Sequence, residues 1–136
     1  MTQSLLIDVP QLKSLVAADD HLLVDCRFNL ADAGQGHQEW LSGHIPGAVY
    51  ADLDKDLAGP VGPLDGRHPL PDARAFAEVL SGWGWREGMT IVAYDAQGGA
   101  FAARLWWLMR YFSRDCVKLL DGGLPAWLAS GGPLRS

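Results

Sequence analysis

A short apolar run followed by a small-residue loop and an apolar helix-forming segment constrains this chain more than any other stretch. The run covers residues 90–94, the loop covers 95–99, and large apolar side chains continue to Trp107. A strand, a tight loop and a helix N-terminus in this order gather backbone N–H groups into a concavity that favours an anion. Many enzymes place a nucleophile at the first position of such a loop. Here that position holds Asp95.

Composition limits the classes of protein to which the chain can belong. With 136 residues, 49% of them hydrophobic, we expect one domain with a hydrophobic core. The net charge of −5 argues against a nucleic-acid partner. Apolar runs fall short of the roughly 18 residues that a membrane span needs, and the N-terminus lacks a signal-peptide pattern. The two cysteines, Cys26 and Cys116, lie in separate segments, which favours a reducing cytoplasm over a disulfide framework.

The pattern of apolar residues predicts strands that alternate with helices. Strands are expected at 22–26, 48–50, 91–94 and 117–120, with a brief apolar run at 5–7. Helices are expected at 9–17, from an Asp72 cap to Trp83, after the 95–99 loop and at 124–129. A shorter helix is expected near 53–57. In the helix after the loop, Phe101, Leu105, Leu108 and Phe112 share one face. Alternation of this kind predicts an α/β domain with a parallel sheet covered on both faces.

Polar residues end the expected strand at 22–26. Asp25, Cys26 and Arg27 stand at its carboxyl end, which is the edge where open α/β sheets keep their ligand sites. Downstream, residues 31–37 have the composition of a flexible loop, and residues 44–48 form a turn signal before the next strand.

Several ordered motifs resemble those of rhodanese-like domains. Residues 39–48, EWLSGHIPGA, resemble the family signature E-aromatic-x-x-G-H-I-P-G-A, and residues 23–27 resemble the Asp-x-Arg strand end that precedes it. Residues 91–107 and 117–127 resemble the active-loop and last-strand regions. The resemblance runs from about Ile7 to Gly132. It implies a rhodanese-like fold, a mostly parallel five-stranded sheet with helices on both faces, as a domain at residues 1–132.

A narrower resemblance concerns two-domain sulfurtransferases. Tyr94-Asp95 followed by residues 103–107, and the stretch 68–71, are similar to the N-terminal domain of thiosulfate and 3-mercaptopyruvate sulfurtransferases, in which only the C-terminal domain carries the catalytic cysteine. The resemblance implies a catalytically inactive N-terminal domain, with residues 133–136 beginning an interdomain linker. It also implies two partners: a C-terminal catalytic rhodanese domain of the same polypeptide, and an anionic sulfur donor at the shared cleft.

The chemistry of the family explains why Asp95 matters. In the family, a cysteine thiolate takes sulfur from thiosulfate or 3-mercaptopyruvate as a persulfide and passes it to a thiophilic acceptor such as cyanide. This step needs a soft nucleophile of lowered pKa. A carboxylate cannot form a persulfide, so we expect no catalytic residue here. We also expect no cofactor and no metal. The equivalent of the active loop is Asp95, Ala96, Gln97, Gly98, Gly99 and Ala100, and we expect the loop to hold its own carboxylate.

Other functions place demands on the sequence that can be compared with its residues. A stand-alone, non-catalytic rhodanese-like binding or regulatory module is the main alternative. An aspartyl nucleophile for phosphoryl transfer needs a second acidic residue for metal, and Ala96-Gln97 supplies none. A phosphatase of the same fold needs the missing cysteine. The four histidines are not spaced for metal binding, and His44, which belongs to the turn motif, is expected to bond to backbone rather than to metal.

Three charged side chains are candidate structural or cleft residues. We expect Arg27 and Glu39 to form an ion pair; the alternative is that Arg27 helps to bind an anionic substrate. Arg104 is expected either to meet the partner domain or to lie in solvent. Cys26 is expected to be a buried small side chain rather than an alternative nucleophile.

Overall fold

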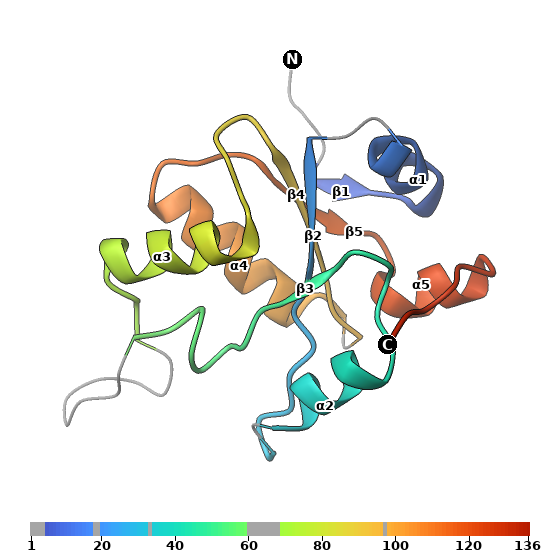
Figure 1. Ribbon diagram of the computed structural model, residues 1–136, viewed down its shortest axis with the longest axis horizontal. Helices are drawn as coiled ribbons and strands as arrows, with labels where there is room; N and C mark the ends of the chain where they lie inside the picture. The colour runs from blue at the N-terminus through green and yellow to red at the C-terminus, as the bar shows by residue number, and fades with distance from the viewer. Residues whose placement is uncertain (1–4, 18–19, 33, 60–68, 97) are drawn as a thin grey trace.

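Five parallel strands form one sheet in a computed structural model that describes residues 5–17, 20–32, 34–59, 69–96 and 98–136. The strands are β1 (Leu6–Ile7), β2 (His21–Asp25), β3 (Val49–Tyr50), β4 (Thr90–Tyr94) and β5 (Val117–Leu120). They lie in the order β1-β5-β4-β2-β3, and every pair is parallel. The predicted sheet is therefore confirmed, and the apolar run at 5–7 supplies one of its edge strands (Figure 1).

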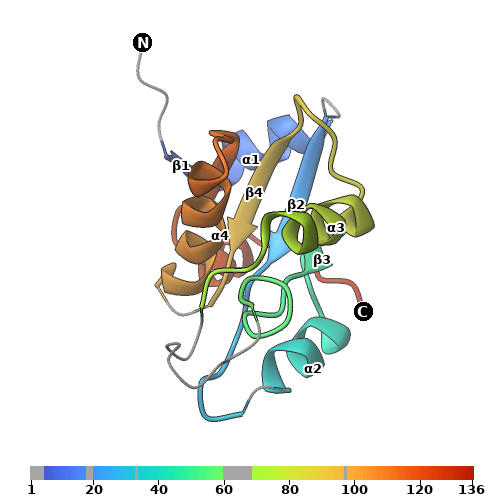
Figure 2. The same cartoon turned by 90° about the vertical axis from the view of Figure 1, so that its left-hand side faces the viewer.

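Helices cover both faces of the sheet, as the alternation predicts. They are α1 (Val9–Ala17), α2 (Gln35–Ser42), α3 (Ala73–Trp83), α4 (Ala100–Tyr111) and α5 (Gly123–Ala129). Helices α3 and α4 pack on one face, and α1 and α5 pack on the other. Figures 1 and 2 place α2 beyond the carboxyl ends of the strands, so α2 can contribute side chains to the edge where a site is expected.

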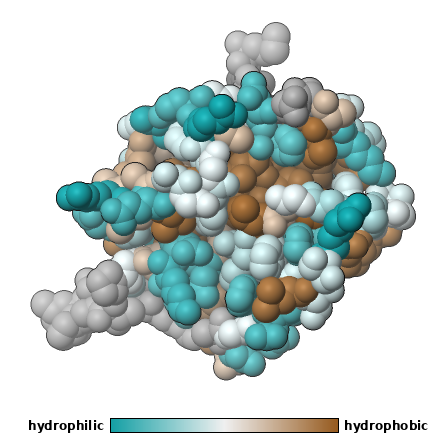
Figure 3. All heavy atoms as spheres, viewed as in Figure 1, coloured by the Kyte–Doolittle hydropathy of each residue, from teal (hydrophilic) through white to brown (hydrophobic). Residues whose placement is uncertain are grey.

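The two hydrophobic clusters follow the two-residue period of the strands. In β4, Ile91 and Ala93 belong to the cluster under α3 and α4, whereas Val92 and Tyr94 belong to the cluster under α1 and α5. All four are buried, because a central parallel strand is covered on both sides. Figure 3, viewed toward the β3 edge of the sheet, shows hydrophobic residues gathered near the middle and hydrophilic residues around them.

Side-chain caps fix the starts of the two helices for which the sequence predicts them. Asp8 accepts a hydrogen bond from the Gln11 backbone N–H at 2.8 Å, and the Gln11 side chain accepts one from the Asp8 N–H at 3.0 Å. Asp72 accepts from the Ala75 N–H at 3.4 Å at the start of α3, which ends at Gly84 in the left-handed conformation. The expected bounds of both helices are confirmed.

Helix α4 joins the loop at 95–99 to the core. Leu105 and Leu108 are fully buried. Phe101 and Phe112, which were predicted to lie on the same face, are half-buried at its two ends. Phe101 packs edge-on against Phe28, with 5.8 Å between ring centroids. Because α4 is tied to the sheet along its length, its first turn is held in place at the carboxyl end of β4.

Two local predictions are wrong. Residues 53–57 form a turn and not a helix. The Asp52 side chain accepts from the Asp54 and Lys55 N–H groups, and the Asp52 carbonyl accepts from those of Asp56 and Leu57. Conversely, the predicted loop and the segment after it contain helix α2. Its N-cap, Gly34, offers no side-chain cap, so packing rather than a local start signal stabilises this helix.

The C-terminal segment folds back onto the domain. His44 and Arg135 form an antiparallel bridge, and the Trp127 indole N–H donates to the Pro133 carbonyl at 2.8 Å. These contacts do not test whether residues 133–136 begin a linker, which stays a prediction. Within the described parts of the chain, no helix is both long and apolar enough to cross a membrane.

The role of α4 leads to a prediction about stability. Leu105→Ala should lower the free energy of unfolding by about 2–5 kcal/mol, because the truncated side chain leaves a cavity between α4 and the sheet. Leu128→Ala, the same change at a side chain that is 48% exposed, should cost about 0.5 kcal/mol or less. Chemical denaturation of both variants measures the difference, and equal losses would contradict this account of the core.

Candidate functional site

The Asp95 carboxylate occupies the cradle of N–H groups at the start of α4. One carboxylate oxygen accepts from the Gly99 N–H at 2.9 Å, and the other accepts from Phe101 and Ala102 at 3.0 and 2.9 Å. The side chain satisfies donors that the first turn of a helix leaves without an intrahelical partner, and its charge is favourable at the positive end of the helix dipole. The residue is only 1% exposed. The loop therefore holds its own anion, as expected.

The rest of the loop shapes this cradle. Gly98 and Gly99 have φ angles of 83° and 94°, a left-handed conformation that costs glycine little and lets the chain turn sharply into α4 at Ala100. Ala96 lines a small hollow at the sheet edge, and Gln97 lies outside the described residues. On the other side, the Asp95 carbonyl accepts from the Leu124 N–H at 2.9 Å, which ties the loop to the start of α5.

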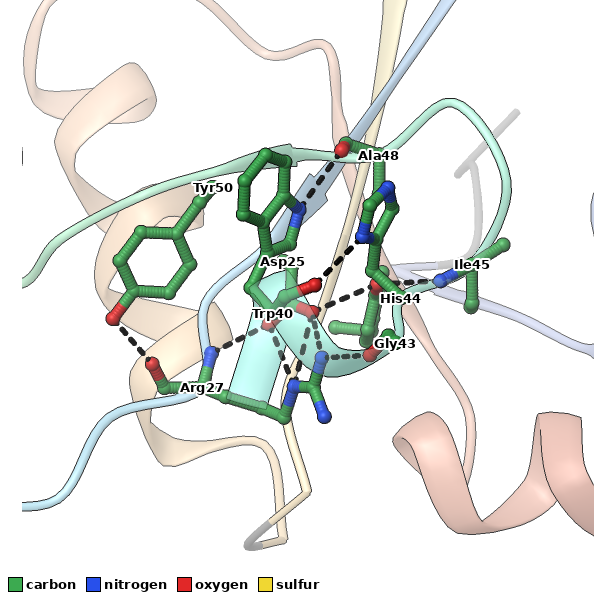
Figure 4. A network of polar contacts seen from close by, with 9 residues as sticks. Asp25, Arg27, Trp40, Gly43, His44, Ile45, Ala48 and Tyr50 are labelled. Atoms are coloured by element: carbon green, nitrogen blue, oxygen red, sulfur yellow. Dashed lines mark hydrogen bonds and ion pairs between the residues drawn. The ribbon is translucent and has the colours of Figure 1, made fainter. Parts of the chain in front are cut away.

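A buried ion pair stands beside the loop at the end of β2. The Arg27 guanidinium donates from Nε to both Asp25 carboxylate oxygens at 3.1 and 3.0 Å, and from Nη2 to Oδ2 at 2.7 Å. Asp25 is completely buried, and the Arg27 side chain is 8% exposed. Burial by itself would lower the pKa of Arg27, but the hydrogen bonds and charge of Asp25 outweigh it and raise the pKa. Figure 4 shows the guanidinium and the carboxylate joined by these hydrogen bonds.

The predicted partner of Arg27 was wrong. Arg27 pairs with Asp25, two residues away, and not with Glu39; Nη2 donates its second bond to the Gly43 carbonyl at 2.6 Å. The side chain folds back along its own strand end because the buried Asp25 carboxylate needs donors more than the exposed Glu39 does. Glu39 acts only as a weaker charge that helps to raise the pKa of Arg27.

Tyr94 joins the ion pair to the turn at 44–48. Its hydroxyl donates to Asp25 Oδ2 at 2.9 Å and accepts from the Ile45 backbone N–H at 3.1 Å. Burial raises the pKa of Tyr94, and the Asp25 charge raises it further, so the phenol stays protonated and can donate. Sequence reasoning missed this residue. Its signal was a hydroxyl in an otherwise apolar strand, one residue before the loop.

The signature at residues 39–48 builds the wall facing this network. His44 Nδ1 lies 2.8 Å from the Trp40 carbonyl, and the Trp40 indole N–H donates to the Ala48 carbonyl at 3.0 Å. The Trp40 and His44 rings are stacked at 4.5 Å. The expected backbone bond of His44 is therefore confirmed. A side chain at Gly36 would collide with the Arg27 carbonyl and the Tyr50 hydroxyl, so α2 can approach the strand end only with glycine there.

Arg104 has a role that neither expectation named. Its Nε and Nη2 donate to the Leu57 carbonyl at 3.0 and 2.9 Å, and Nη2 also donates to the Pro69 carbonyl at 3.2 Å. Burial lowers the pKa of this guanidinium. Arg104 thus fastens α4 to two backbone segments that the sequence places twelve residues apart, so it does not simply lie in solvent.

The two thiols are poorly placed for nucleophilic chemistry. Cys26 is buried as expected, and burial raises the pKa of its thiol well above the usual value, with the charges of Asp25 and Asp95 adding to the effect. Burial likewise raises the pKa of Cys116. Among the residues that the structure describes, no group of three or more His, Cys, Asp or Glu could hold a metal ion.

These features define a class of protein: a parallel α/β domain with an anion cradle at the carboxyl edge of its sheet. The model of the rhodanese-like domain family matches residues 8–130, and the chain belongs to this family. The relatives it resembles are sulfurtransferases.

It is 47% identical to a protein of Pseudomonas aeruginosa named probable 3-mercaptopyruvate sulfurtransferase, over 96% of this chain and 47% of that protein. It is 38% identical to thiosulfate/3-mercaptopyruvate sulfurtransferase 2 of Arabidopsis thaliana, over 99% of this chain and 39% of that protein. Among solved structures, 3-mercaptopyruvate sulfurtransferase from Leishmania major superposes with a TM-score of 0.87 at 28% identity, over 96% of this chain and 36% of the other. The chain thus spans less than half the length of each of these relatives.

The Tyr94 hydroxyl leads to a prediction. Tyr94→Phe should lower the free energy of unfolding by about 1–3 kcal/mol, because the Asp25 carboxylate loses a donor and the Ile45 N–H loses its acceptor in a buried place. Tyr111→Phe is the matched control, since this tyrosine is 55% exposed, and it should leave stability nearly unchanged. Urea denaturation compares the two; a silent Tyr94→Phe would mean that the hydroxyl does not hold the turn.

Proposed function

We propose that this chain is the non-catalytic rhodanese domain of a sulfurtransferase that moves sulfane sulfur from thiosulfate or 3-mercaptopyruvate to a thiophilic acceptor. The observation that carries the proposal is the Asp95 carboxylate, which occupies the N–H cradle where the family resemblance places the catalytic cysteine. The domain supplies scaffold and one wall of the cleft, and a second rhodanese domain of the same polypeptide supplies the thiolate.

The chemistry of the loop supports this division of labour. Sulfur transfer requires a polarisable thiolate that can form a sulfur–sulfur bond, and the oxygens of Asp95 cannot do so. All three cradle contacts are already made by this side chain, which leaves the cradle closed to an external anion. Cys26 cannot substitute for the missing cysteine, because its thiol is buried and its pKa is raised.

The lengths of the relatives favour a tandem arrangement over a stand-alone module. Each of the two curated relatives named above is more than twice as long as the part that this chain matches. The reading frame beyond Ser136 discriminates the two proposals. A second rhodanese domain with cysteine at the first loop position would support the tandem enzyme, and a stop codon would support an independent binding or regulatory module.

The proposal predicts that the purified 136-residue chain does not catalyse sulfur transfer. In a thiosulfate:cyanide assay, thiocyanate formation should not exceed the background rate, because no residue of the loop can carry the sulfur. The same assay with a catalytically competent rhodanese verifies the reagents. Turnover above background that persists in Cys26→Ser and Cys116→Ser variants would overturn the assignment of the loop as inactive.

Asp95→Cys tests whether the cradle itself is intact. A thiolate at this position would accept hydrogen bonds from the same backbone N–H groups. It would attack the outer sulfur of thiosulfate and release sulfite, which leaves a cysteine persulfide. Mass spectrometry should therefore show one added sulfur atom on the variant. The wild-type chain and Asp95→Ser should show none, since neither has a thiol in the cradle. A folded Asp95→Cys protein without added sulfur would mean that the loop shape no longer suits sulfur chemistry.

A further inference from the structure

Arg27 uses only part of its hydrogen-bonding capacity. A guanidinium carries N–H donors on all three nitrogens. Nε and Nη2 are fully engaged by Asp25 and the Gly43 carbonyl, whereas Nη1 has no hydrogen-bond partner among residues 5–17, 20–32, 34–59, 69–96 and 98–136. Figure 4 shows this third nitrogen pointing away from the network. A side chain that is 92% buried thus leaves the donors of one nitrogen aimed outward.

Arg27 lines two hollows at the sheet edge. One hollow, of about 370 Å³, is lined by Arg27, Gly43, Leu134 and a polar face of α2. The other, of about 140 Å³, is lined by Arg27, Phe28, Asn29, Gln35, Glu39 and Ala96. Since each water takes about 30 Å³ in the liquid, even the smaller hollow has room for a ligand of several heavy atoms.

One face of α2 supplies the polar lining. Gln35, Gln38, Glu39 and Ser42 follow the i, i+3, i+4, i+7 spacing that places side chains on one side of a helix, and all four line the larger hollow. The opposite side of α2 packs against the strand end through Gly36. Amide and hydroxyl groups on the lining side can donate to a ligand oxygen that also reaches Arg27 Nη1.

The charges around the hollows select for a small ligand. Asp25 balances most of the charge of Arg27, and the three N–H bonds of the cradle hold the Asp95 carboxylate away from the hollow. Glu39, exposed at the rim, repels an anion. A ligand is therefore attracted by directed N–H donors rather than by net positive charge. Such a site suits a small anion of low charge with two oxygen acceptors better than a polyanion.

We propose that Arg27 Nη1 and the polar face of α2 form a binding site for a small oxyanion, either a carboxylate or a sulfur oxyanion. The site is separate from the N–H cradle, which Asp95 already fills. It consists of residues of this chain alone, so it does not depend on a second catalytic domain. With one charged donor group opposed by Glu39, the dissociation constant should be on the order of millimolar.

The test is a titration of the full 136-residue chain with sodium acetate and with sodium thiosulfate, followed by ¹H–¹⁵N NMR at constant ionic strength set with chloride. Peaks from residues 35–42 and the side-chain amides of Gln35 and Gln38 should shift and saturate. Glu39→Gln should bind about three to five times more tightly, because a like charge leaves the rim, and Gln38→Glu should bind more weakly by a similar factor. Both sites of change are exposed, so the fold should persist.

Glu78→Gln, the same change at an exposed position on α3, controls for net charge and should leave the affinity unchanged. Equal affinity in the Glu39 and Glu78 variants would overturn the proposal, as would shifts spread over all basic residues. Absence of saturable shifts with both anions would assign the hollows to water. Activity is not the readout, so an inactive chain that binds the anion contradicts nothing in the proposal, and a failure to bind leaves the assignment of the Asp95 loop untouched.

Discussion

The buried pair of Asp25 and Arg27 is the interaction on which the carboxyl edge of this domain depends. Asp25 ends β2 without solvent, so its charge must be satisfied by donors, and Arg27 and Tyr94 supply them. The same donors reach onward to Gly43 and Ile45, at either side of the His44 turn. Removing one partner of such a pair typically costs about 3–5 kcal/mol, because the other charge remains buried. The conformation of the His44 turn and that of the β2 strand end therefore depend on the same ion pair.

The loop after β4 keeps its shape with a carboxylate at its first position. The N–H groups of Gly99, Phe101 and Ala102 converge on one point, and they need an acceptor whether or not chemistry occurs there. An alanine in place of Asp95 would leave these donors without a partner below the surface. The Asp95 carboxylate meets this requirement for an acceptor, so the loop does not need a thiolate to keep its shape.

How far the sequence predicts this structure depends on the range of the interaction that decides each feature. Strands β2 and β4 and helices α1 and α3 carry their own periodicity and caps, and their prediction was confirmed. Helix α2 lacks a cap and depends on packing at Gly36, so local signals miss it. Among the site residues, Asp95 was predictable because its partners follow it directly in the chain.

The contacts of Arg27 and Arg104 were not predictable in this way. Either arginine could have paired with several acceptors, and burial decides which one it binds. Arg27 binds the carboxylate that is shielded from water, and Arg104 binds the Leu57 and Pro69 carbonyls near the start of α4. A sequence gives the spacing of charges but not which of them lose solvent. Because that loss decides which partner a charge takes, the pairing at a strand end can be derived only after the sheet that buries it has been assembled.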